Sequence, residues 1–204
     1  MKTMDKLVDD MISSNMLKSP LIIDAFRTID RKYFVPDEYA EDAYIDAPLP
    51  IGNYQTISQP STVAFMMERL APQEGNKILD IGSGSGWTTA LLCHIVGEEG
   101  SVTGVERIDA LVEQGRENLF KFHFGKHCGI ESAGEKLGLP GEQFDRILVS
   151  ASADEIPEEL FSQLNIGGIL VIPVENSIYK FTKVSEEDIK TEEFYGIVFV
   201  PLIY

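Results

Sequence analysis

From Lys77 to Val174 the sequence alternates between short apolar runs and longer segments with helical periodicity. Apolar positions recur at helical spacing from Trp87 to Ile95 and again from Ile108 to Phe122. Pro157 opens a further segment, PEELFSQL, at a natural first helical position. The runs typical of buried strands are KILDIG (77–82), SVTGVER (101–107), FDRILVSAS (144–152) and GGILVIPV (167–174). This alternation with short connections predicts an α/β fold with a doubly wound, mostly parallel sheet.

The two flanks of this core have a different character. The first 75 residues are helical in pattern up to about Ile29, and a stretch rich in Pro and Tyr follows (33–60). We expect that stretch to be ordered but irregular and to cover an edge of the sheet. The runs SIYKFTKVS (177–185) and EFYGIVFVPLIY (193–204) have no helix between them and predict a closing antiparallel hairpin. We therefore expect one domain over 1–204, with a covering segment (1–75), a core (76–175) and a β segment (176–204).

Charge and composition limit the partners of the chain. Lys and Arg number 17 against 33 Asp and Glu, which gives a net charge of −16 and argues against nucleic acid or an anionic membrane as partner. The acidic run EEDIKTEE (186–193) is interpreted as a solvated loop. The sequence contains neither a membrane-spanning apolar run nor the apolar core of a signal peptide. Cys93 lies in an apolar helical pattern and is expected to be a buried free thiol in a reducing, cytoplasmic setting.

The stretch LDIGSGSGW (79–87) forms a glycine loop directly after a predicted strand, where ligands bind in doubly wound sheets. Its spacing is not that of a dinucleotide fingerprint, and the absence of a following Lys-Ser or Lys-Thr excludes a P-loop. Asp80 could attract a ligand ammonium, and Glu106 at the end of the next strand could accept ribose hydroxyls. These features favour S-adenosylmethionine, with NAD as the second candidate; alternatively, the glycines only permit close helix packing. The candidate loop residues are Gly82, Ser83, Gly84 and Gly86.

Four stretches together resemble the protein-L-isoaspartate O-methyltransferase family over nearly the whole chain. They are FVPDEYAEDAYIDAPLPIGNYQTISQP (34–60), ILDIGSGSGW (78–87) with VER (105–107), FDRILVSASADEIPEEL (144–160) with LNIGGILVIPV (164–174), and VFVPLI (198–203). The resemblance implies a seven-stranded S-adenosylmethionine-dependent methyltransferase sheet with N-terminal helices. It also implies repair of damaged proteins by methylation of the α-carboxylate of L-isoaspartyl residues. Its expected partners are isoaspartyl proteins and peptides, with no metal, and we expect a monomer.

The resemblance also assigns residues. Ser58 corresponds to the active-site serine of the family, with Gln55, Thr56, Val200 and Leu202 expected around the substrate, and Arg107 beside Glu106 at the donor. The substrate carboxylate is already ionised at neutral pH, so the reaction needs positioning and desolvation rather than a general base. An ordinary turn with self-satisfied hydroxyls is the alternative interpretation of the Thr56–Ser58 stretch.

One departure from the family concerns the adenine. The family carries Gly-Asp-Gly before a Leu-Gly pair, whereas this chain has SAGEKLG (132–138), with Gly134 and Glu135 at the last two positions. Either Glu135 replaces the acid with a shift of one residue, or backbone groups hold the adenine. The departure keeps two alternatives open: a related enzyme for another carboxylate, and a binding protein that has lost transfer. The run HFGKHC (123–128) lacks a fourth ligand and is interpreted as a polar helix end rather than a metal site.

Overall fold

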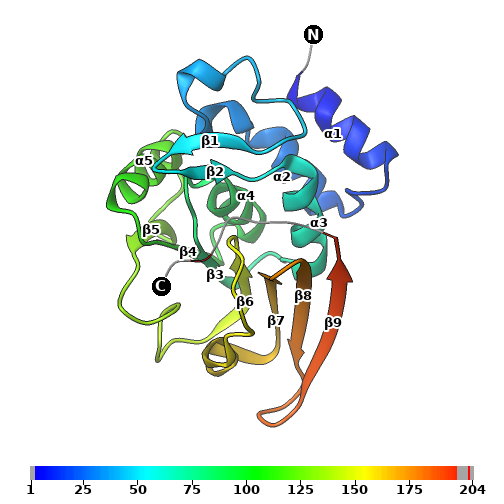
Figure 1. Cartoon of the computed structure of the whole chain (residues 1–204), viewed down its shortest axis with the longest axis vertical. Coiled ribbons are helices and arrows are strands. Elements are labelled where there is room, and N and C mark those ends of the chain that lie inside the picture. Colours follow the sequence, from blue (N-terminus) through cyan, green and yellow to red (C-terminus); the bar gives the residue numbers. More distant parts are fainter. Residues whose placement is uncertain (1–2, 197–201, 203–204) are drawn as a thin grey trace.

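A computed structural model describes residues 3–196 and 202 of the chain. Its centre is a seven-stranded sheet in the order β5-β4-β3-β6-β7-β8-β9 (Figure 1). The strands are β3 Lys77–Ile81, β4 Ser101–Glu106, β5 Cys128–Ser132, β6 Phe144–Val149, β7 Leu164–Val174, β8 Ser177–Lys183 and β9 Ile189–Tyr195. The pairs from β5 to β7 are parallel, and β8 and β9 add antiparallel. The predicted α/β fold with an antiparallel end is confirmed.

The helices cover one face of this sheet. They are α1 Met4–Ser13, α2 Pro20–Thr28, α3 Pro60–Leu70, α4 Trp87–Val96 and α5 Asp109–Phe120. Their buried side chains form one cluster with sheet residues such as Ile78, Val102 and Leu148. The neighbouring strand positions point the other way because side chains alternate along a strand. There Leu79 and Ile147 pack with the short 3-10 helix η3, Glu158–Gln163. The expected helix after Pro157 is thus only this 3-10 helix.

The segment expected to be irregular contains regular structure. Two short 3-10 helices, η1 Arg31–Phe34 and η2 Asp37–Tyr39, precede an antiparallel hairpin of β1 Leu49–Gly52 and β2 Gln55–Ile57. The turn residues Asn53 and Tyr54 have φ of 52° and 59°, the left-handed geometry that two-residue hairpin turns favour. The hairpin lies over the carboxyl ends of the central strands (Figure 1). Residue 58 lies in the short link between β2 and helix α3, directly after this hairpin.

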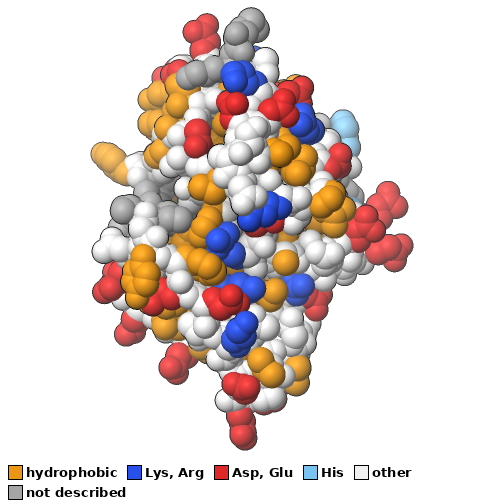
Figure 2. Space-filling view, turned by 90° about the vertical axis from the view of Figure 1, so that its right-hand side faces the viewer, with side chains coloured by type: hydrophobic (Ala, Val, Ile, Leu, Met, Phe, Trp, Pro, Cys, Tyr) orange, Lys and Arg blue, Asp and Glu red, His pale blue; other side chains and the backbone are white. Residues whose placement is uncertain are grey.

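Two further sequence expectations were wrong. The HFGKHC stretch is not simply the end of a helix, because its last residue, Cys128, begins the edge strand β5. Only Ile130 of that strand is buried, so its sequence carries little of the alternation that identifies strands. The acidic run 186–193 is not one loop, since β9 begins at Ile189 and only the residues before it form the turn. Lys180 pairs with Glu192 across this hairpin at 3.2 Å, and Lys and Arg side chains stand among acidic ones on this side of the molecule (Figure 2).

The two cysteines are not free thiols. Cys93, in the last turn of α4, is joined to Cys128, at the start of β5, by a disulfide across Cα atoms 6.0 Å apart. The partners are 35 residues apart in sequence, so only the packing of α4 against the edge strand reveals the pair. The expectation of a reducing, cytoplasmic setting therefore loses the observation on which it rested. In the described part of the chain, no helix has the length and apolar character needed to cross a membrane.

Candidate active site

The glycine loop between β3 and α4 combines two roles. Gly82, Gly84 and Gly86 have φ of 77°, 53° and 88°, which a glycine adopts without strain. Gly82 and Gly84 line a pocket. Gly86 instead permits close packing on α5, because a Cβ there would lie 3.1 Å from the carbonyl oxygen of Gly115. The loop thus lines a pocket at two of its glycines and permits close helix packing at the third.

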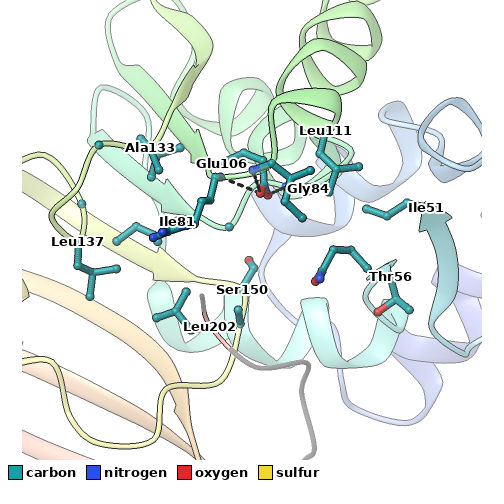
Figure 3. A pocket seen from close by; sticks show the side chains of 18 of the residues that line it. Ile51, Thr56, Ile81, Gly84, Glu106, Leu111, Ala133, Leu137, Ser150 and Leu202 are labelled. Atoms are coloured by element: carbon teal, nitrogen blue, oxygen red, sulfur yellow. Dashed lines mark hydrogen bonds between the residues drawn. The ribbon is translucent and has the colours of Figure 1, made fainter. Parts of the chain in front are cut away.

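The pocket opens at the carboxyl ends of β3, β4 and β6, between the glycine loop and the β1–β2 hairpin (Figure 3). It encloses about 760 Å³ including its open mouth, a size typical of small-molecule sites. Its walls combine apolar side chains with backbone and a few polar groups. The lining residues are Ile51, Gln55, Thr56, Ile81, Gly82, Gly84, Val105, Glu106, Arg107, Ile108, Leu111, Ala133, Gly134, Lys136, Leu137, Gly138, Ser150, Ala151 and Leu202.

Among the described residues that line this pocket, Glu106 is the one carboxylate. Its Oε2 accepts a hydrogen bond from the backbone N–H of Gly84 at 2.9 Å. Its Oε1 accepts from the N–H groups of Arg107 and Ile108 at 2.8 and 2.9 Å (Figure 3). These three donors fix the carboxylate between the glycine loop and the start of α5. The remaining acceptor capacity of this carboxylate can take a hydroxyl donor.

Asp80 lies beneath the glycine loop rather than in the pocket wall. Its side chain is fully buried, and its Oδ2 accepts the hydroxyls of Thr88 and Thr89, both at 2.7 Å. The Ser150 hydroxyl lies 3.5 Å from Oδ1 and also lines the pocket. Burial raises the pKa of Asp80 from its ordinary 3.8 to about 6, although the hydroxyl donors oppose this shift. Asp80 thus joins β3 to the first turn of α4 and does not itself line the pocket.

A smaller hollow adjoins the pocket on the side of Ser58. Its lining includes Thr56, Ser58, Ser83 and the start of α4. It shares four wall residues with the larger pocket: Thr56, Gly82, Gly84 and Ser150. Ser58 is half-buried, and none of the described residues hydrogen-bonds its hydroxyl. The structure therefore places Ser58 and Glu106 in the linings of two hollows that share part of their wall.

The other predicted site residues fall into three groups. Gln55, Thr56, Arg107, Gly134 and Leu202 line the larger pocket, and Leu202 is held there by its N–H, which donates to the carbonyl of Ser152 at 2.6 Å. Glu135 is exposed and lines a separate hollow with Pro140 and Glu159, which favours backbone groups over its carboxylate as partners of a base. Val200 lies outside the described residues.

Sequence reasoning missed much of the apolar lining. Ile51 of β1 approaches the loop so closely that its Cδ1 would lie 3.3 Å from a Cβ at Gly84. Leu111 of α5 and Leu137 face the pocket from two other segments (Figure 3). The PLPIG stretch was the one available signal for Ile51. Nothing in the sequence distinguishes Leu111 from the other core positions of its helix.

No metal centre accompanies these hollows in the described part of the chain. There, no three His, Cys, Asp or Glu side chains gather closely enough to hold an ion. Cys128 of the HFGKHC stretch is engaged in the disulfide.

This sheet order, with a glycine loop after β3 and a carboxylate at the end of β4, defines an S-adenosylmethionine-dependent methyltransferase. The model of the Protein-L-isoaspartate(D-aspartate) O-methyltransferase family matches residues 2–204, and the chain belongs to that family. A protein-L-isoaspartate O-methyltransferase of Ignicoccus hospitalis is 38% identical over 203 residues, covering 97% of this chain and 96% of that one. One of Methanopyrus kandleri is 38% identical, covering 98% and 90%.

A solved structure extends the comparison to the fold. The Plasmodium falciparum protein-L-isoaspartate O-methyltransferase, in complex with S-adenosyl-L-homocysteine, superimposes with a TM-score of 0.90. It is 25% identical in sequence, and the match covers 100% of this chain and 99% of that one. The predicted family, fold and donor class are therefore confirmed.

Proposed function

We propose that the chain methylates the α-carboxylate of L-isoaspartyl residues in damaged proteins, with the donor in the larger pocket and the acceptor in the hollow beside Ser58. The observation that carries this assignment is the shared wall of the two hollows, which brings donor and acceptor within one reaction space. A carboxylate oxygen attacks the methyl carbon, the bond from sulfur to carbon breaks, and its electron pair returns to sulfur. The sulfonium becomes a neutral thioether, and no proton moves.

On the donor side, Glu106 accepts a ribose hydroxyl and thereby orients the nucleoside. The apolar side chains of Ile108, Leu111 and Leu137 supply flat contact for a base. Ala133 and Gly134 present backbone to the same region, in place of the acid that the family carries. Asp80 lies beneath the loop and adds a negative field that favours the donor ammonium over an anionic ligand such as a pyrophosphate.

On the acceptor side, Ser58 donates its hydroxyl to one carboxylate oxygen and leaves the other free to attack. Thr56 borders both hollows and therefore limits the approach of the two substrates. Closing out water around the carboxylate strengthens its interaction with the sulfonium and raises its reactivity.

Methyl transfer from labelled S-adenosylmethionine to a short L-isoaspartyl peptide tests the assignment. The same peptide with normal aspartate is the control, and binding of S-adenosylhomocysteine is measured by calorimetry in parallel. Transfer to the isoaspartyl peptide alone is expected. Donor binding without transfer to either peptide would favour another carboxylate substrate, and absence of donor binding would favour a binding protein.

A further inference from the structure

Arg31 of η1 is completely buried beneath the acceptor hollow. Its Nη1 donates to the carbonyl of Ala43 at 2.8 Å and lies 3.4 Å from that of Ile45. Its Nη2 donates to the carbonyls of Ala47 and Ser58 at 3.0 and 3.1 Å. One guanidinium thus holds the turn at 43–47 and the backbone of the proposed active-site serine at the same time.

The same guanidinium also touches Trp87, another residue that lines the acceptor hollow. Its carbon lies 5.5 Å from the ring centroid of Trp87, the first residue of α4 after the glycine loop. The Trp87 indole donates to the carbonyl of Ile29, two residues before Arg31. Arg31 therefore contacts both the backbone of Ser58 and the first residue of α4, two parts of the lining of the acceptor hollow.

Burying this charge is costly, and no salt bridge in the described part of the chain compensates it. Within that part, the Nε atom has no hydrogen-bond partner. Burial lowers the pKa of Arg31 to about 10, which still leaves it charged at neutral pH. Hydrogen bonds to carbonyls offset only part of the free energy that burial of this charge costs. An apolar side chain of similar volume often stabilises a fold as well or better, so stability alone does not explain the arginine.

A second tether fixes the same turn. Asp46 accepts hydrogen bonds from the Ser61 backbone N–H at 2.9 Å and from the Gln59 amide at 3.2 Å. Gln59 and Ser61 both follow Ser58 in the sequence, so the turn is joined to the segment directly after the serine. With its carbonyl held by Arg31, the backbone of Ser58, from which the side chain projects, is restricted before any substrate binds.

We propose that Arg31 is a positioning residue of the methyl transfer, which acts through Ser58 by fixing its backbone relative to the donor loop. The inference rests on the proposed function. It assigns Arg31 an effect on the acceptor step and none on donor binding, because its contacts reach the serine directly but do not reach the lining of the donor pocket.

The test compares Arg31→Gln and Arg31→Lys with the wild type. Lysine keeps the charge but cannot reach two pairs of carbonyls, whereas glutamine removes the charge and avoids a buried ammonium. Arg27→Lys is the matched control, because Arg27 forms its ion pairs with Asp5 and Asp9 on α1, away from both hollows. Each protein is assayed for kcat and KM with an isoaspartyl peptide and for the Kd of S-adenosylhomocysteine by calorimetry.

Both Arg31 variants are expected to lose at least about tenfold in kcat/KM for the peptide, as loss of a charged hydrogen bond implies, with an unchanged Kd for S-adenosylhomocysteine. In a Ser58→Ala background, the same substitutions should have almost no further effect, because the residue through which Arg31 acts is already lost.

Three results would overturn the inference: full peptide activity in the variants, an equal loss in the Ser58→Ala background, or a parallel loss of S-adenosylhomocysteine affinity. Failure of both variants to fold would overturn it too, since Arg31 would then belong to the framework rather than to the serine. The wild-type assay keeps the two proposals apart. A wild type inactive on the peptide refutes the proposed function and the inference with it, whereas active Arg31 variants refute only the inference.

Discussion

The buried carboxylate of Asp80 gives a quantitative prediction about stability and pH. Its pKa is about 6 in the folded protein against an ordinary 3.8, a rise of about two pH units. At about 1.4 kcal/mol per unit, the ionised side chain costs roughly 3 kcal/mol of folding free energy. Because the pKa is raised on folding, the contribution of Asp80 to stability is fully present below pH 3.8 and is lost as the pH rises through about 6.

The substitution Asp80→Asn removes this titration while preserving the shape. The asparagine carbonyl can accept the hydroxyls of Thr88 and Thr89, and its NH₂ group can donate to the Ser150 hydroxyl. No buried polar group is left without a partner. We therefore expect the variant to gain stability relative to the wild type as the pH rises, by about 2 kcal/mol between about pH 4.5 and 7.5.

Urea unfolding of both proteins across this pH range measures the difference, and the titration of all other carboxylates cancels in it. Asp154→Asn is the matched control, because it makes the same substitution at an exposed carboxylate. A flat difference for Asp80→Asn would show that Asp80 titrates alike in the folded and unfolded chain. The argument from burial would then be refuted.

Three further predictions concern the site and its support. Ser58→Ala should lower turnover on an isoaspartyl peptide about 10- to 100-fold, as loss of one hydrogen bond to a charged group implies, with the calorimetric Kd of S-adenosylhomocysteine unchanged; equal loss of that affinity would contradict the role. Glu106→Ala should weaken S-adenosylhomocysteine binding at least about tenfold in a protein with native circular dichroism, and unchanged affinity would remove it from the ribose. Reduction of the Cys93–Cys128 disulfide, which closes a loop of 35 residues, should lower the free energy of unfolding by about 3 to 4 kcal/mol in urea titrations. A Cys93→Ser, Cys128→Ser double variant should match the reduced protein and should not respond to reductant.

The features that the sequence predicts well are those written in consecutive residues. The glycine loop and Glu106 each follow directly from a buried strand, so their meeting at one edge of the sheet is a matter of topology. The edge strand β5 escaped because only Ile130 of its five residues is buried. The hairpin turn at Asn53 and Tyr54 escaped because it depends on left-handed backbone at residues other than glycine.

The features that escaped completely depend on long-range contacts. Nothing near Arg31 in sequence indicates that its guanidinium reaches the carbonyl of Ser58, 27 positions away. The disulfide is likewise set by how α4 crosses the edge strand. Glu135, which the sequence offered as a substitute for a missing acid, faces solvent because its segment turns Gly134 rather than Glu135 toward the pocket.

The shared wall between the two hollows has a consequence for the order of events in a reaction cycle. Thr56, Gly82, Gly84 and Ser150 contact both spaces, so any adjustment of these residues by one ligand alters the affinity for the other. Thermodynamic linkage makes this effect reciprocal: a donor that favours acceptor binding by some factor is itself held more tightly by that factor. After methyl transfer, both products lie against the same four residues. The departure of the methyl ester and the departure of S-adenosylhomocysteine are then linked steps rather than independent ones.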